Sequence, residues 1–287
     1  MKKLLIVFGL IVATATQAQN YSFDVKISGK GQPVLLIPGL ASHGSVWDEA
    51  VENLNSKYEC HVVTLPGFAG QPAVERENYL VSIGDELIGY LKDNKLKKSI
   101  VIGHSLGGFL TLYIGSNEPT LAQKLVVVDG LPFLAALQNP SATEESGEKM
   151  AEMMKAQMLN QTKAQYEAMQ PLMLQTMITS DEDIATAMEW GRQSDGATVA
   201  QAMGDLYSID LRDDLARITA PTLVLGAWYG YKDYGATLES TTQLYHDQFK
   251  NHKNYRLEMS AQGKHFIMWD DPEFFLRVVN DFLNEKI

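Results

Sequence analysis

The chain has 287 residues, of which 45% are hydrophobic and 21% charged, so it can bury a sizeable core and is too mixed in composition to be disordered. Its formal net charge is −11 and no Lys/Arg cluster offsets it, which argues against binding to nucleic acid or anionic lipid. Cys60 is the only cysteine, which excludes an internal disulfide and a cysteine-based metal site. No residues have the spacing of metal ligands, and we expect neither a metal nor a cofactor.

The N-terminal segment has the pattern of a secretory signal peptide. Lys2 and Lys3 precede an apolar run at residues 4–13, and small residues follow where a signal peptidase cuts. We expect residues 1–18 to be removed and the mature chain, exported to the periplasm or secreted, to begin at Gln19. The alternative is an uncleaved anchor, but the run is shorter than the ~20 residues that span a bilayer. We expect no membrane association of the mature form.

Short β-branched runs alternate with helical patterns from residue 21 to about residue 130. Strands are predicted at residues 22–27, 34–37, 59–64, 99–102 and 125–128, and helices at residues 46–55, 79–94 and 106–117. The later strands are continuously apolar, as strands covered on both faces must be. This alternation predicts a mostly parallel sheet with right-handed crossovers.

The middle of the chain, residues 131–220, has no strand-like run and holds nine of the twelve methionines. Two methionine trios recur at every fourth residue, so each shares one helical face: Met150, Met154 and Met158, then Met169, Met173 and Met177. We expect these faces to pack in a core; the alternative is that they line a deformable apolar pocket under a lid.

Predicted strands and helices alternate again after residue 220, as they do in the first part of the chain. Strands are predicted at residues 221–227 and 255–259, and helices at residues 237–250 and 272–284. We therefore predict an α/β fold with a mostly parallel central sheet flanked by helices. Residues 19–130 and 221–287 form this core, and residues 131–220 form an inserted helical cap.

A G-x-S-x-G pattern at residues 103–107 follows a predicted strand and opens a predicted helix. This is the context of a nucleophile elbow, in which the serine sits on a strained turn at the strand end. Glycine at positions 103 and 107, which has no side chain, would allow the strand and the helix to approach each other closely. The pattern predicts Ser105 as a nucleophile.

A serine hydroxyl needs a neighbouring base, usually a histidine held by a carboxylate. Of the six histidines, His265 is favoured because it lies between the last predicted strand and the last helix, at the carboxyl edge of the sheet. His104 should point away from the site and pack, and His43 is expected to be a solvated loop residue near the same edge. The other three are interpreted as structural or exposed: His61, His246 and His252.

Together these motifs resemble the α/β-hydrolase fold family, and the resemblance covers essentially the whole mature chain. Residues 36–47 are similar to the family's H-G-x-x-x-(x)-S-x-x-W stretch, with Pro38 where histidine is common. The resemblance implies that the backbone N–H groups of Leu40 and Leu106 form the oxyanion hole.

The acid departs from the family's commonest pattern, which places it a few residues after the strand predicted at residues 221–227. No carboxylate follows that strand until Asp233. A minority arrangement, found in haloalkane dehalogenases and some lipases, puts the acid after the strand that follows the elbow helix, where Asp129 stands. We favour Asp129, although it could merely cap its loop, and keep Asp233 as the alternative if its loop folds back toward His265.

The resemblance implies that members of the family that remove halogens or open epoxides use a carboxylate nucleophile. A serine at the elbow therefore argues against both reactions. Acyl transfer to water remains, through an acyl-enzyme on Ser105 and with His265 as base and acid. We expect a serine esterase that acts on small-molecule carboxylic esters or lactones with bulky apolar groups. Trp228 and Tyr229, in an aromatic loop at the catalytic edge, are candidates for substrate contact or for anchoring the loop.

Three alternatives remain beside the esterase. A peptidase of the prolyl-aminopeptidase type holds a free amino terminus with acidic cap residues, although the acids available here also fit a solvated helix face: Glu144, Glu145, Glu148 and Glu152. A cofactor-free perhydrolase or haloperoxidase uses the same triad. A non-catalytic binding protein would need a broken triad, whereas all three members are present. The sequence sets no oligomeric state.

Overall fold

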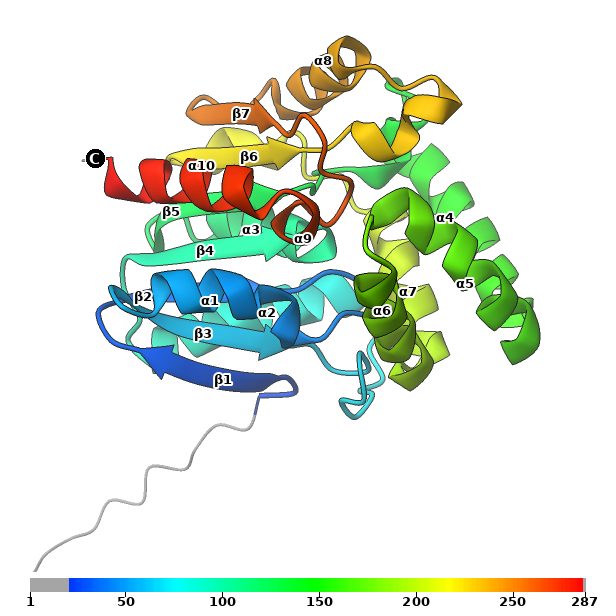
Figure 1. The fold of residues 1–287 in the computed structure, drawn as a ribbon, viewed down its shortest axis with the longest axis horizontal. Coiled ribbons are helices and arrows are strands. Elements are labelled where there is room, and N and C mark those ends of the chain that lie inside the picture. The colour runs from blue at the N-terminus through cyan, green and yellow to red at the C-terminus, as the bar shows by residue number, and fades with distance from the viewer. Residues whose placement is uncertain (1–20, 286–287) are drawn as a thin grey trace, which may run out of the picture.

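The computed structural model describes residues 21–285, so the predicted signal peptide lies outside the described residues. Seven strands form one sheet in the order β1-β3-β2-β4-β5-β6-β7 (Figure 1). Their bounds are β1 (Asp24–Gly29), β2 (Gln32–Ile37), β3 (Tyr58–Thr64), β4 (Ser99–His104), β5 (Ala122–Val128), β6 (Thr222–Gly226) and β7 (Tyr255–Met259). β1 pairs antiparallel with β3, whereas β2 to β7 run parallel, so the carboxyl ends of six strands meet at one edge.

Helices cover both faces of the sheet (Figure 1). Their bounds are α1 (Asp48–Leu54), α2 (Tyr79–Asp93), α3 (Leu106–Asn117), α8 (Leu238–Phe249), α9 (Ile267–Asp270) and α10 (Pro272–Asn284). Side chains alternate along a strand, so Leu35 and Val101 pack with α2 and α3, whereas Leu36 and Ile102 pack with α1 and α10. The apolar runs of the central strands therefore fill two cores.

The segment between β5 and β6 is helical and lies at the carboxyl edge of the sheet (Figure 1). It contains η2 (Leu134–Leu137), α4 (Glu144–Asn160), α5 (Lys163–Met177), α6 (Asp181–Gln193), α7 (Gly196–Ser208) and η3 (Asp214–Arg217). Each α-helix begins after a side chain that accepts an N–H of its first turn, which fixes where it starts: Thr143, Thr162, Ser180 and Asp195. α4 packs on α7, and α5 packs on α6.

The predicted fold class is confirmed, and the bounds differ at a few ends. The helix predicted at residues 46–55 is a 3₁₀ turn, η1 (Gly44–Trp47), followed by α1, because the His43 side chain accepts the Ser45 N–H and starts the turn. β5 begins three residues earlier than the predicted strand. Its Lys124 is buried and donates to the carbonyls of Phe282 and Leu283, so a charged residue lies inside a core strand.

The two methionine trios of the cap behave differently. Met150, Met154 and Met158 pack against buried clusters, as expected. The second trio was expected to pack as well, but Met169 and Met173 are 57% and 48% exposed, and only the third member, Met177, packs against the core. Although α5 packs on α6, no described element covers the Met169 and Met173 side chains. Within residues 21–285, no helix combines the length and the apolar composition that crossing a bilayer requires.

Candidate active site

Ser105 occupies a strained turn between β4 and α3. Its backbone has φ 54° and ψ −115°, a conformation that costs free energy for a residue with a side chain. The Ser105 N–H donates to the Val128 carbonyl at 2.8 Å, which ties the turn to β5. A Cβ at Gly103 would lie 2.0 Å from the Gly107 carbonyl oxygen, and one at Gly107 would lie 2.2 Å from that of Ile37. Both glycines are therefore required for the close approach of strand and helix.

His265 follows β7 and meets the carboxylate that follows β5. Its Nδ1 lies 2.6 Å from Asp129 Oδ2, and both side chains are largely buried. Asp129 also has a positive φ of 48°, and its N–H donates to the Leu225 carbonyl at 2.7 Å, so the backbone holds the carboxylate at the sheet edge. Asp233, the alternative acid, is exposed in the 3₁₀ helix η4 (Tyr229–Tyr234). The structure thus brings Asp129, and not Asp233, to His265.

The second oxygen of Asp129 accepts two further hydrogen bonds. Tyr245 Oη donates to Oδ1 at 2.5 Å, and the Ala227 N–H donates to it at 2.8 Å. Burial, and then the charge of Asp129 and the hydrogen bond to it, raise the pKa of Tyr245 well above 10, so the phenol stays a donor. Sequence reasoning missed Tyr245. A Cβ at Gly226 would lie 2.8 Å from the tyrosine ring, so the glycine at the end of β6 leaves room for Tyr245.

His104 is fully buried beside the histidine that follows β7. Its Nε2 lies 3.1 Å from the His265 carbonyl oxygen, and the two rings have centroids 4.6 Å apart. Burial, followed by the nearby His265, lowers the pKa of His104 well below 6.5. A neutral ring that faces a carbonyl must donate from Nε2, so His104 holds the His265 backbone. It packs away from solvent, as its place before the serine predicts.

The backbone N–H groups of Leu40 and Leu106, which the resemblance implies as oxyanion donors, belong to two segments that meet at Ser105. Among residues 21–285, neither group donates a hydrogen bond to another group of the protein. Leu106 is the first residue of α3, where the helix dipole favours negative charge. A Cβ at Gly39 would lie 3.2 Å from Ser105 Cβ, so the Leu40 loop rests directly on the elbow. The arrangement provides two donors beside a serine.

Comparison with known proteins assigns the chain to a family. A model described as the alpha/beta hydrolase family matches residues 34–278. The chain belongs to the alpha/beta hydrolase family. Pimeloyl-[acyl-carrier protein] methyl ester esterase of Nitrosomonas europaea is 27% identical over 212 residues, which cover 71% of this chain and 79% of the relative. The enzyme of the same name from Aeromonas hydrophila is 25% identical over 267 residues, which cover 91% and 99%.

A solved structure agrees with this assignment at the level of the fold. An esterase from Exiguobacterium antarcticum superposes with a TM-score of 0.74 at 18% identity, over 92% of this chain and 96% of that one. In the family's commonest pattern the acid follows the strand that corresponds to β6. In this alpha/beta hydrolase the end of β6 supplies the Ala227 N–H instead, and that N–H binds the Asp129 carboxylate.

The aromatic loop after β6 joins the hydrolase core to its cap. Trp228 and Tyr229 are half-buried and contact each other edge to face at 5.8 Å, and Lys232 Nζ lies 3.8 Å from the centre of the Tyr229 ring. A Cβ at Gly230 would lie 2.1 Å from the Thr176 carbonyl oxygen at the end of α5. These contacts anchor the loop, and a contact of either aromatic side chain with substrate stays a prediction.

The remaining histidines of this hydrolase have structural partners. His43 was expected to be solvated, but it is half-buried: its Nδ1 accepts the Ser45 N–H and its ring lies 6.2 Å from that of Trp190. The other three pair with hydroxyl groups, as their structural interpretation predicts: His61 with Tyr90, His246 with Tyr255 and His252 with Thr222.

Cys60 and the acidic residues of α4 lie outside the site. Cys60 is buried, and burial raises the pKa of its thiol to about 11. All four glutamates weighed for a peptidase are exposed on α4: Glu144, Glu145, Glu148 and Glu152. In the part of the chain that the structure describes, no three or more His, Cys, Asp or Glu side chains are grouped to hold a metal ion.

Proposed function

We propose that this alpha/beta hydrolase cleaves carboxylic esters through an acyl-enzyme on Ser105, with His265 as general base and Asp129 as the acid that orients it. The observation that carries the proposal is the 2.6 Å hydrogen bond between His265 and Asp129, at the same sheet edge as a strained serine elbow. Relatives that match most of the chain are named methyl ester esterases, which supports an ester as the substrate.

In the proposed reaction, Ser105 Oγ attacks the ester carbonyl carbon while its proton passes to His265 Nε2. The carbonyl oxygen becomes an oxyanion that accepts hydrogen bonds from the Leu40 and Leu106 N–H groups. The intermediate collapses as the carbon–oxygen bond of the alcohol breaks, and the imidazolium returns the proton to the leaving alkoxide. Water then attacks the acyl-enzyme by the same route, with its proton taken by His265 and given to Ser105 as the acid leaves.

The surroundings of Asp129 suit this role. Its carboxylate accepts three hydrogen bonds, from His265, Tyr245 and the Ala227 N–H, and this fixes its orientation. A fixed carboxylate keeps the proton of neutral His265 on Nδ1, so that Nε2 is the basic atom, and it stabilises the imidazolium when it forms. Because the side chain of Asp129 is 10% exposed, water screens this interaction little.

We propose a small-molecule ester with an apolar acyl or alcohol group as the substrate. Half-buried Trp228 and Tyr229 adjoin Ala227, whose N–H binds Asp129, so aromatic surface lies close to the reacting groups. No observation favours an aminopeptidase, because the glutamates of α4 face solvent and Glu145 already pairs with Lys149.

The protein is proposed to act outside the cytoplasm, after removal of residues 1–18. The order of lysines, apolar run and small residues at the N-terminus supports this. A single buried cysteine leaves no exposed thiol to cross-link in an oxidising compartment. N-terminal sequencing of protein from the periplasm and the medium tests the proposal, and a chain that keeps Met1 in the cytoplasmic fraction would contradict it.

The first test of the function uses the purified protein with p-nitrophenyl esters, aminoacyl naphthylamides and a fluorophosphonate probe. Ester cleavage and one adduct on Ser105 are expected. Ser105→Ala should remove the adduct and lower kcat by at least about 10³-fold, because no other group supplies the nucleophile. Ser141→Ala, at an exposed serine of the cap, is the matched control. Amide cleavage without ester cleavage would overturn the esterase proposal, and a persistent adduct in Ser105→Ala would overturn the nucleophile.

A further inference from the structure

The end of cap helix α5 is bound by the loop that carries His265. The last carbonyl groups of an α-helix lack partners within the helix. Lys264 Nζ donates to the Gln175 carbonyl at 2.6 Å and to the Ile178 carbonyl at 3.0 Å, and the Phe266 N–H donates to the Met177 carbonyl at 3.2 Å. The two residues on either side of His265 therefore cap a helix that lies almost 90 positions earlier in the chain.

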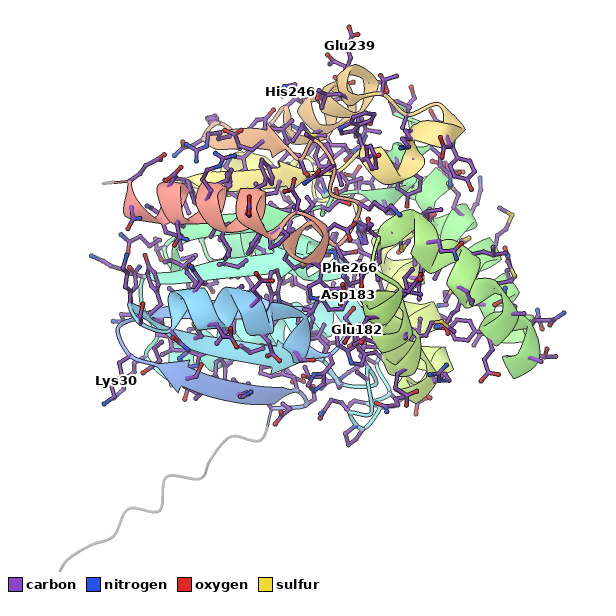
Figure 2. All side chains as sticks on the ribbon, in the orientation of Figure 1. Lys30, Glu182, Asp183, Glu239, His246 and Phe266 are labelled. Carbon is purple, nitrogen blue, oxygen red and sulfur yellow. The ribbon has the colours of Figure 1, made fainter. Side chains whose placement is uncertain are left out.

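Asp270 in α9 strengthens the same junction. Its Oδ1 accepts the Thr179 N–H at 2.9 Å, just beyond α5, and its Oδ2 accepts the Lys264 N–H at 3.0 Å. Phe266 is buried and stacks on Trp269 at 5.1 Å. Phe266 and Asp183 of α6 are both labelled where the core meets the cap in Figure 2. We call this set the cap junction: Lys264, Phe266 and Asp270, bound to residues 175–179.

The opposite side of the loop is held by the core. His104 donates from Nε2 to the His265 carbonyl at 3.1 Å, and it is fully buried. The backbone of His265 thus lies between one hydrogen bond from the core and the contacts of the cap junction. Among residues 21–285, the His265 imidazole forms a hydrogen bond with one side chain, that of Asp129, so the direction of Nε2 depends on this bond and on the position of the loop backbone.

Physical chemistry favours a cation at the Lys264 position. An ammonium group near a helix C-terminus binds the unpaired carbonyls and interacts favourably with the helix dipole. Catalytic groups must be held within about 0.5 Å of their working position, and a displacement of about 1 Å costs about 10²-fold in rate. A group that fixes the loop directly beside the base therefore acts on the rate.

We propose that Lys264 is a positioning residue for His265, and that the C-terminus of cap helix α5 is the support against which it holds the histidine. This inference rests on the proposed function, in which His265 is the general base. The cap then contributes to the chemical step, because a shift of α5 moves the loop that carries His265.

The test compares Lys264→Met, which keeps an unbranched apolar stem without the ammonium, with Lys264→Arg, which keeps a cation. Lys149→Met on α4 is the matched control, since that lysine is exposed and forms its ion pair with Glu145, on the same helix. For a p-nitrophenyl ester, Lys264→Met should lower kcat by about 10- to 100-fold with KM within about twofold. The low-field proton resonance of the His265–Asp129 hydrogen bond should broaden. Lys264→Arg should keep most of the wild-type kcat and a sharp low-field resonance. Lys149→Met should match the wild type in both.

A folded Lys264→Met protein with unchanged kcat and an unchanged resonance overturns the proposal, as does a change in KM alone. If Lys264→Met does not fold, as judged by circular dichroism, Asp270→Asn loosens the same junction and is expected to lower kcat and broaden the resonance. An unaltered Asp270→Asn protein would then overturn the proposal. If the wild type cleaves no ester, the proposed function fails, but the resonance still reports whether Lys264 positions His265.

Discussion

The carboxylate of Asp129 accepts hydrogen bonds from three separate parts of the chain: the loop after β7, helix α8 and the end of β6. The third donor is the N–H of Ala227, the first residue after β6. In the commonest pattern of the family, the acid lies a few residues after this strand. In this protein the carboxylate follows β5, and the residue after β6 supplies a donor to it. The carboxylate can still contact His265, because β5 and β6 are parallel neighbours that end at the same edge of the sheet.

The position of the carboxylate after β5 predicts that Asp129, and not Asp233, is needed for activity. Asp129→Asn should lower kcat by about 10³- to 10⁴-fold, because an amide permits the wrong tautomer of His265 and does not stabilise its imidazolium. Asp233→Asn, at an exposed aspartate of η4, is the matched control and should leave kcat/KM within about twofold. Steady-state kinetics on a p-nitrophenyl ester measure both. A larger loss in Asp233→Asn than in Asp129→Asn would refute the assignment.

Tyr245 allows a finer change at the same carboxylate. Tyr245→Phe removes one hydroxyl and leaves Asp129 Oδ1 with the Ala227 N–H alone, so we expect kcat to fall about tenfold at nearly constant KM. Unfolding in urea should show a loss of about 1–2 kcal/mol for the lost buried hydrogen bond. Tyr255→Phe also removes one tyrosine hydroxyl, which forms an exposed hydrogen bond with His246 away from the site, and should change kcat little. Equal kcat values in the two variants would mean that Tyr245 has no part in orienting Asp129.

At the scale of elements, sequence reasoning was most accurate where local chemistry marks an end. α10 begins at the predicted Pro272, because proline suits a first helical turn, and β7 has the predicted bounds. The 3₁₀ helix η4 was missed, because its turn depends on Gly230 fitting against α5 rather than on a periodic pattern. Met169 and Met173 were wrongly expected to pack. Periodicity states which side chains share a helix face, but not whether another element covers that face.

In the candidate site too, sequence reasoning found the residues that belong to a local motif and missed those that depend on distant contacts. Ser105 could be proposed from five consecutive residues, because the steric demand of the elbow is local. Tyr245 could not, since the carboxylate that it binds lies 116 positions away, and Lys264 binds a carbonyl 89 positions away. Neither residue belongs to a local motif. Side chains that support a site from a distance are found only once the topology has placed the sheet edge and the cap together.

At the scale of the whole molecule, buried neutral histidines lie at both ends of the sheet. His104 stands at the carboxyl end of β4, and His252 binds Thr222 Oγ1 at the amino end of β6. Burial lowers the pKa of His104 well below 6.5 and that of His252 to about 4. In the unfolded chain both rings take up a proton near pH 6.5, so falling pH favours the unfolded state.

The sign of this linkage gives a prediction for His252. Between about pH 4 and pH 6.5 the unfolded chain binds a proton that the folded protein excludes, so the free energy of unfolding must decrease as the pH falls through this window. His252→Gln keeps a polar group beside Thr222 and removes the titration. Urea unfolding at pH 7 and pH 5 should show that the wild type loses about 1–2 kcal/mol more than the variant between the two values. Because His104 titrates alike in both proteins, the difference belongs to His252. Parallel losses in the two proteins would show that His252 is as accessible to protons in the folded state as in the unfolded chain.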